Sequence, residues 1–191
     1  MTRIALIIGS TRTPRIGPSI ANVVLEIVKP LLPSGSTLEI LDLKDHPVPM
    51  HLFDAPPAGV TPGSYPDAAT NAWSAVISSF DAFIILTPQH NWGYPAVLKL
   101  ALDALYHEWA KKPAVVISYG SHGGGKANAQ LRQVLSGLRM RVCERFVELP
   151  FARGHDQAGA EIDSATNDRW RIENKKVELV QAWDAFMALC A

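Results

Sequence analysis

The sequence predicts an α/β domain built on a parallel sheet with helices on both faces. Two observations lead to this fold class. Five short apolar runs alternate with longer amphipathic segments along the 191-residue chain, and this alternation is typical of a doubly wound three-layer fold. Apolar residues make up 48% of the chain, which is enough for a full core. The length is that of one domain, so we expect residues 1–191 to form a single domain.

The expected strands are the apolar runs themselves. Continuous runs are typical of strands that are buried on both faces of a sheet. The last run is more polar, as an edge strand would be. The five runs cover residues 4–8, 37–43, 82–87, 114–118 and 142–149.

Helical patterns fill the gaps at residues 18–32, 67–79, 95–109, 126–138 and 168–189. Pro95 suits a first helical turn, and in the last helix one face carries Leu179, Trp183, Phe186 and Cys190. Two segments, 46–65 and 151–166, are longer than ordinary connections. Such segments are typical of functional lids or partner surfaces.

Charge and cysteine content exclude several classes of partner. Lys+Arg and Asp+Glu balance at 18 each, so the chain has no basic footprint for nucleic acid or for an anionic membrane. Two cysteines are too few for a disulfide framework and favour a reducing compartment. The N-terminus lacks a signal-peptide layout, and no apolar run could span a bilayer. We therefore expect a cytoplasmic protein.

The loop after the first strand has the features of a phosphate site. It runs from residue 9 to residue 19 and leads into a helix, whose N-terminus offers free N–H groups. Hydroxyl groups and positive charge come from Ser10, Thr11, Arg12, Thr13, Arg15 and Ser19. The loop matches neither the P-loop nor the dinucleotide-binding glycine pattern. By itself it could equally be an ordinary loop whose hydroxyls cap the helix.

The loop after the third strand, residues 87–95, suits a flat aromatic ring. Gly93 allows a close backbone approach, and Trp92 and Tyr94 provide aromatic area. Between Pro88 and Pro95 the loop also carries Gln89, His90 and Asn91. Trp92 considered alone could be a core residue. His90 has no second ligand at metal-binding spacing, so we expect no metal.

The loop after the fourth strand contains Ser118, Tyr119 and Gly120, followed by Gly123, Gly124 and Gly125. These glycines permit positive φ and a close approach to a ring, although a flexible turn has the same composition. Three ligand-type loops after neighbouring strands carry more weight than any one of them, because the carboxyl ends of parallel strands meet at one edge of the sheet.

Together these motifs resemble the NADPH-dependent FMN reductase family, in particular its fungal FMN-dependent NAD(P)H:quinone reductase branch. The resemblance covers about residues 4–147. It rests on residues 9–12, on residues 88–95 with Leu98 and Lys99, and on residues 118–120 with Gly123 and Gly124. It implies a flavodoxin-like fold with strand order 2-1-3-4-5, non-covalent flavin mononucleotide (FMN) and a homodimer.

The resemblance also assigns roles to residues of this chain. Ser10, Arg12 and Ser19 would hold the FMN phosphate, and Arg15 and Gly17 belong to the same loop. The isoalloxazine ring would lie against residues of the other two loops, with the amides of residues 91–93 near N5 and O4. His90 stands where family members commonly have Tyr or Phe. The ring contacts are Pro88, Gln89, His90, Asn91, Trp92, Gly93, Tyr94, Ser118, Tyr119, Gly120, Gly123 and Gly124.

The implied activity is hydride transfer from NAD(P)H through FMN to quinones, flavins or similar acceptors, with ping-pong kinetics. FMN carries this chemistry, so we assign no catalytic side chain. Two other roles stay open: a flavodoxin-type electron carrier, and a redox-sensing scaffold for a protein partner. Electron carriers tend to be acidic, whereas this chain has no net charge.

The helix expected at 95–109 also predicts the homodimer. A helix that packs on one face of a sheet needs only an apolar stripe, and the apolar residues of this helix cover far more of its surface. An exposed apolar surface of that size usually marks an interface between subunits. The alternative is coverage by the segment 46–65. The apolar residues are Val97, Leu98, Leu100, Ala101, Leu102, Ala104, Leu105, Tyr106 and Trp109.

Overall fold

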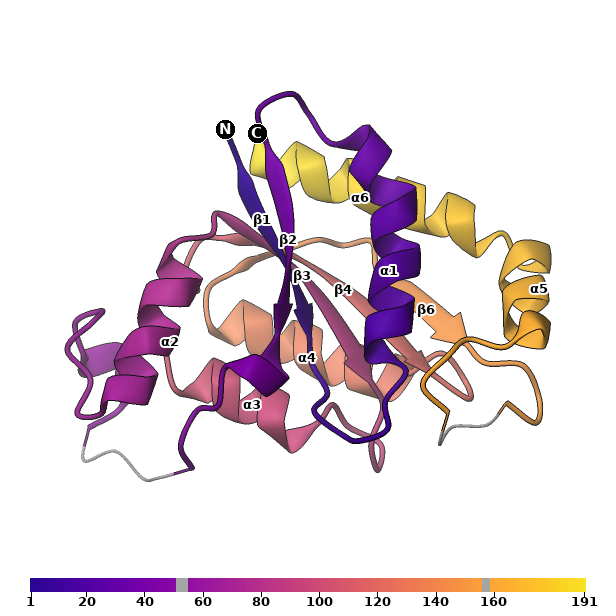
Figure 1. The fold of residues 1–191 in the computed structure, drawn as a ribbon. Coiled ribbons are helices and arrows are strands. Elements are labelled where there is room, and N and C mark those ends of the chain that lie inside the picture. The colour runs from indigo at the N-terminus through magenta and orange to yellow at the C-terminus, as the bar shows by residue number, and fades with distance from the viewer. Residues whose placement is uncertain (51–54, 156–158) are drawn as a thin grey trace.

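The computed structural model describes residues 1–50, 55–155 and 159–191, and within them the chain forms a six-stranded parallel sheet between two layers of helices (Figure 1). The strand order is β2-β1-β3-β4-β5, and β6 also pairs with β4. This confirms the predicted fold class and strand order. The strands are β1 (Arg3–Ile8), β2 (Thr37–Asp42), β3 (Ala82–Pro88), β4 (Pro113–Gly120), β5 (Arg141–Val142) and β6 (Val147–Pro150).

The two faces of the sheet carry separate apolar cores because successive strand residues point to opposite sides. From β1, Ile4, Leu6 and Ile8 pack in the core beneath α1 (Gly17–Val28) and α6 (Lys175–Cys190). Ala5 and Ile7 pack in the other core, beneath α2 (Ala68–Ser78), α3 (Ala96–Asp103) and α4 (Gly125–Gly137). All seven residues of β3 are buried, as predicted for a central strand.

The fifth predicted strand is wrong as a continuous element. Residues 141–142 and 147–150 form two short strands, and both pair with β4. Between them the backbone leaves the ladder where Glu144 and Arg145 are exposed. Arg132 of α4 donates to the Glu144 carbonyl and lies over the Phe146 ring. These contacts with a helix replace the strand pairing at the interruption.

The last predicted helix is also wrong as a single element. It consists of α5 (Ser164–Ile172) and α6, separated at Asn174, whose φ of 55° is left-handed. The α-helix cannot continue through such a residue. The start of α5 is set by Asp163, whose side chain accepts a hydrogen bond from Thr166 N. The predicted one-face packing in α6 is confirmed for Leu179, Trp183 and Phe186.

Helix α3 is shorter than predicted, since it ends at Asp103 rather than near residue 109. Six of its nine predicted interface residues are buried within the subunit, namely Leu98, Ala101, Leu102, Ala104, Leu105 and Trp109. Val97, Leu100 and Tyr106 are half-buried. The apolar area left for a second subunit is therefore smaller than the helix pattern suggested.

Part of that coverage comes from the segment 46–65, of which residues 51–54 lie outside the described residues. Tyr65 is buried, and its hydroxyl donates to the buried Glu108 carboxylate at 2.9 Å. Ser74 donates to the same carboxylate at 2.5 Å. Val48 and Val60 pack against the same core. Short 3-10 helices occur at Lys29–Leu31, Leu43–Asp45 and Pro57–Gly59.

The other long segment, 151–166, includes residues 156–158, which also lie outside the described part. The start of this segment is held against α5, because Trp170 Nε1 donates to Pro150 O and Thr166 Oγ1 accepts from Ala152 N. Among the described residues, we find no helix that combines the length and the apolar character needed to cross a membrane.

Candidate functional site

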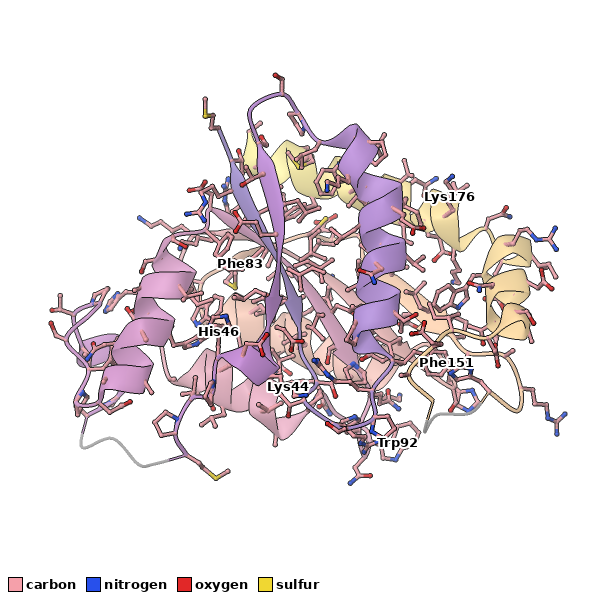
Figure 2. All side chains as sticks on the ribbon, viewed as in Figure 1. Lys44, His46, Phe83, Trp92, Phe151 and Lys176 are labelled. Atoms are coloured by element: carbon pink, nitrogen blue, oxygen red, sulfur yellow. The ribbon has the colours of Figure 1, made fainter. Side chains whose placement is uncertain are left out.

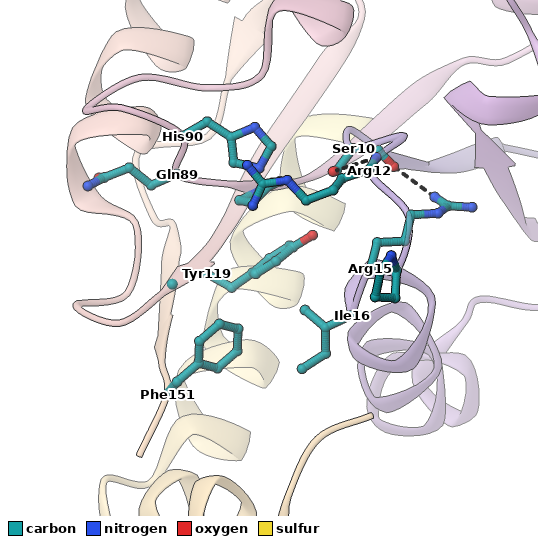
Figure 3. Close-up of a pocket in the computed structure, with 11 residues that line it drawn as sticks. Ser10, Arg12, Arg15, Ile16, Gln89, His90, Tyr119 and Phe151 are labelled. Carbon is teal, nitrogen blue, oxygen red and sulfur yellow. Dashed lines mark hydrogen bonds between the residues drawn. The ribbon is translucent and has the colours of Figure 1, made fainter. Parts of the chain in front are cut away.

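A cleft lies at the carboxyl ends of β1, β3, β4 and β6, and all three predicted loops contribute to it (Figure 3). Of the seventeen residues predicted for the site, eight line this cleft: Ser10, Arg12, Arg15, Pro88, Gln89, His90, Tyr119 and Gly120. The other nine lie in the same loops but outside the lining, and the role of each side chain in binding stays a prediction. These nine are Gly17, Ser19, Asn91, Trp92, Gly93, Tyr94, Ser118, Gly123 and Gly124.

The two arginines of the first loop have different surroundings. Arg15 is largely buried and donates to Ser10 O at 2.8 Å and to Asp42 Oδ1 at 2.9 Å, so its charge is neutralised by the carboxylate. Arg12 is exposed and forms no ion pair with any described residue, and its side chain extends toward the His90 ring (Figure 3). Arg12 is therefore the cation of this loop that is free to meet an anion.

Helix α1 begins at this loop without a side-chain cap. Its first N–H groups consequently lack the acceptor that a capping residue would supply, and the positive end of the helix dipole faces the cleft. The alternative interpretation, in which the loop hydroxyls cap the helix, is thus wrong. Ser19 Oγ donates instead to Glu161 at 3.0 Å.

Gly17 has a packing role. A Cβ atom at this position would lie 2.9 Å from Ile8 Cγ2 and 3.1 Å from the Tyr119 hydroxyl oxygen. A larger residue would therefore push the first loop away from β1 and Tyr119.

The second loop is a tight two-residue turn. His90 and Gly93 exchange backbone hydrogen bonds of 2.8 and 2.9 Å, and Asn91 and Trp92 have left-handed φ values of 46° and 69°. The Gly93 amide is therefore already used, whereas the Asn91 and Trp92 amides have no acceptor among the described residues. Trp92 is 69% exposed and lies at the edge of the molecule, far from the interior Phe83 (Figure 2). Its interpretation as a core residue is wrong.

Gln89 connects the second loop to the third. Its backbone N–H donates to Tyr119 O at 3.1 Å, and its side-chain oxygen accepts from Lys126 N at 3.0 Å in the first turn of α4. The Gln89 side-chain N–H₂ group forms no hydrogen bond with any described residue. The hydrogen bond between Lys126 N and Gln89 joins the loop after β3 to the start of α4, so it fixes these two parts of the structure relative to each other.

In the third loop, Ser118 holds the backbone in place. Its buried hydroxyl donates to Gly123 O at 2.8 Å and accepts from Asn128 Nδ2 at 3.1 Å. Gly124 has a φ of 82°, and a Cβ atom there would lie 2.9 Å from Tyr119 O. The loop thus requires glycine at this position, and Ser118 and Gly124 act on the site through the Tyr119 backbone.

The titratable groups of the cleft are held in their neutral forms. Burial lowers the pKa of His90, and the nearby positive charge of Arg12 lowers it further. Burial raises the pKa of Tyr119, an effect that Arg15 and Arg12 partly oppose. At neutral pH the cleft therefore offers an uncharged imidazole and a phenol beside the Arg12 guanidinium.

Three lining residues were missed in the sequence: Pro14, Ile16 and Phe151. The Phe151 ring lies beside Tyr119, with ring centroids 6.0 Å apart. Phe151 directly follows β6, so the rule that ligands bind at carboxyl ends of strands would have found it. Pro14 and Ile16 are apolar residues of the first loop, whose sequence pattern indicates only hydroxyl groups and positive charge.

These features fit a flavin monophosphate: an uncapped helix N-terminus, an unpaired arginine, and aromatic and amide groups on the opposite wall. Within the described residues, no three His, Cys, Asp or Glu side chains are grouped as a metal site would need.

Comparison with known proteins agrees with this geometry. Residues 2–154 match the NADPH-dependent FMN reductase family. The chain is 42% identical over 146 residues to the NAD(P)H-dependent FMN reductase LOT6 of Saccharomyces cerevisiae, covering 73% of this chain and 76% of that protein. It is 35% identical over 190 residues to the NAD(P)H-dependent FMN reductase ntnL of a Nectria species, covering 96% and 94%.

A solved structure shows the same fold at lower sequence identity. The flavoenzyme NAD(P)H:(acceptor) oxidoreductase FerB from Paracoccus denitrificans superimposes with a TM-score of 0.67 and 21% identity, covering 98% of both chains. The family match extends over most of the chain and includes all three loops of the cleft. The chain therefore belongs to the NADPH-dependent FMN reductase family.

Proposed function

We propose that this protein binds FMN non-covalently in the cleft and uses NAD(P)H to reduce quinones, flavins or similar small acceptors. The observation that carries the proposal is that the unpaired Arg12 lines the same cleft as Ile16, the N-cap residue of the uncapped α1. This combination suits one terminal phosphate dianion. The relatives described above bear the names of FMN reductases and support the same activity.

Bound FMN supplies hydride transfer between a reduced nicotinamide and an acceptor. The protein positions and polarises the ring. We propose that Arg12 and the first N–H groups of α1 hold the phosphate. The free amides of Asn91 and Trp92 and the Gln89 side-chain amide donate to the ring edge. Such donors stabilise the negative charge of a reduced flavin.

An open cleft that gives access to bound FMN also favours sequential use of the same flavin face. We propose that NAD(P)H and the acceptor occupy that face in turn, which gives ping-pong kinetics. Quinones are the first acceptor class to test, because several relatives are named quinone reductases. We assign no acid–base residue, because bound FMN would carry the chemistry.

The purified protein tests the cofactor and the reaction separately. Mass spectrometry of the released flavin should give FMN, and FAD would contradict the phosphate site. Anaerobic mixing with NADPH should then bleach the flavin absorbance within the turnover time, and a quinone should restore it. Failure of NADPH to bleach a correctly loaded protein would indicate an electron carrier instead.

We also propose a homodimer. The half-buried Val97, Leu100 and Tyr106 and the exposed Trp92 at the cleft rim support a second subunit beside the site. Light scattering at micromolar concentration should give about twice the chain mass of 20.8 kDa, and a monomer with full NADPH oxidation would contradict the dimer. The proposed location is the cytoplasm, which fits the two free cysteines.

A further inference from the structure

A second cavity, with a volume of about 350 Å³, lies at the same edge of the sheet as the cleft. Phe151 lines both, so a ligand bound in the cleft could extend across this ring into the cavity. The cavity is formed by the residues after β4, the residues after β6, and α5. Its lining residues are Ser121, His122, Phe151, Ala152, Arg153, Gly154, His155 and Arg169.

The lining is cationic. It contains two arginines and two histidines, and none of its eight residues is an aspartate or a glutamate. Arg169 is already engaged, because its Nε pairs with Glu173 at 2.7 Å and one terminal nitrogen donates to Phe151 O at 2.5 Å. Arg153 is exposed and forms no ion pair with any described residue. The cavity therefore contains positive charge that the described part of the chain does not neutralise.

His155 gives the cavity a buried and oriented polar group. Its side chain is only 3% exposed, its Nδ1 lies 2.9 Å from Asp163 Oδ2, and its ring packs on Phe151 with centroids 4.4 Å apart. Asp163 is itself held by Thr166 N at 2.7 Å. The other ring nitrogen, Nε2, is buried without a hydrogen-bond partner.

A buried nitrogen without a partner costs free energy, and native proteins rarely leave one unless a ligand uses it. An imidazolium that donates to Asp163 through Nδ1 can donate to an anion through Nε2. The two observations are independent: the unpartnered His155 Nε2 indicates a polar ligand group, and the Arg153 charge indicates an anion.

We propose that this cavity binds the 2′-phosphate of NADPH, an inference that rests on the proposed function. Arg153 and His155 Nε2 would be its donors, with His122 at the entrance. Sites that select NADH place a carboxylate at the ribose 2′-hydroxyl, whereas sites that accept NADPH place an arginine at the 2′-phosphate. The described lining residues include two arginines and no carboxylate, and such a lining belongs to the second kind. The protein should therefore prefer NADPH to NADH.

The first test compares the two nucleotides on the FMN-loaded protein. In Arg153→Ala, the ratio of KM for NADPH to KM for NADH should rise about tenfold, because only NADPH carries the phosphate that loses a charged partner. Arg171→Ala is the matched control. It removes one positive charge from α5 at a side chain that is 77% exposed and outside the cavity, and its ratio should equal that of the unmodified protein. An unchanged ratio in Arg153→Ala would overturn the proposal, as would an equal rise of both KM values.

A binding measurement separates this inference from the proposed activity. Calorimetry on the FMN-loaded protein should show that adenosine 2′,5′-bisphosphate binds at least tenfold more tightly than adenosine 5′-monophosphate. His155→Gln, in which the side chain stays polar, should remove most of that difference. Equal affinities for the two nucleotides would overturn the phosphate site even if NADPH is oxidised. Selective binding of the bisphosphate without NADPH oxidation would support the phosphate site and contradict only the proposed reaction.

Discussion

Arg15 and Asp42 form an ion pair that joins the loop after β1 to the end of β2. Both side chains are largely buried, at 13% and 16% exposure. The same guanidinium donates to Ser10 O, so it holds the loop after β1 in place (Figure 3). The ion pair gives different roles to two arginines that look equivalent in sequence. Arg15 positions the loop, and Arg12 remains available for a ligand.

The first prediction concerns Arg12→Ala. Loss of one charged hydrogen bond should weaken FMN binding by about 1.5–3 kcal/mol, which is roughly a 10- to 150-fold rise in Kd. Fluorescence titration of the FMN-free protein measures it. Arg171→Ala, which removes an exposed surface charge, is the control and should bind FMN normally. Equal affinity of the two variants would show that Arg12 does not contact the phosphate.

The second prediction concerns Asp42→Asn. This change keeps the oxygen that accepts from Lys44 N at 3.0 Å but leaves the Arg15 charge without its partner. The free energy of unfolding should fall by about 1.5–3 kcal/mol, measured by urea denaturation. Asp103→Asn breaks the exposed Lys99–Asp103 pair and should cost under about 1 kcal/mol. Similar costs for the two variants would mean that Arg15 and Asp42 are not coupled.

The third prediction concerns the titration of His90. Burial and the Arg12 charge hold its pKa below the ordinary value of 6.5, so the folded protein binds this proton less readily than the unfolded chain. The contribution to stability is therefore present above about pH 6.5 and is lost as the pH falls below it. NMR titration should show the lowered pKa in the FMN-free protein. In Arg12→Ala the pKa should rise, and an unchanged pKa would exclude Arg12 as a cause.

The fourth prediction concerns Tyr65→Phe. The Tyr65 hydroxyl donates to the Glu108 carboxylate at 2.9 Å in a buried cluster. Its removal should lower the free energy of unfolding by about 1–3 kcal/mol, since a buried acceptor loses a hydrogen-bond partner. Tyr106→Phe is the control, because the Tyr106 hydroxyl makes no hydrogen bond within the described residues. A loss below 0.5 kcal/mol would mean that another donor replaces Tyr65.

The fifth prediction concerns Trp92→Ala. Because Trp92 is 69% exposed, the free energy of unfolding should change by less than about 0.5 kcal/mol. Turnover with NADPH and a quinone should change severalfold, since the indole stands at the rim of the proposed FMN site. Ile172→Ala, at a 74% exposed site on α5, should change neither. A large loss of stability without a change in turnover would indicate a purely structural residue.

The fold class could be predicted from the sequence, and so could the edge of the sheet at which the candidate site lies. Continuous apolar runs such as residues 4–8 and 82–87 report burial on both faces, and their alternation with helices leaves a parallel sheet as the solution. The carboxyl ends of parallel strands meet at one edge, so loops starting at Gly9, Thr87 and Ser118 had to come together. The motifs in those loops were sufficient for recognising the family.

The tertiary structure alone decided which side chains of those loops face the cleft. Arg15 lies 27 positions before Asp42, and their pairing depends on how β1 and β2 are placed side by side. The same holds for Phe151, which reaches the cleft because β6 pairs with β4. The hydrophobic pattern of a segment indicates which of its residues are buried. It contains no information about which distant residues they contact. Contacts between distant residues produce the ion pairs, the end of α3 and the second cavity. These features could therefore be seen only in the folded chain.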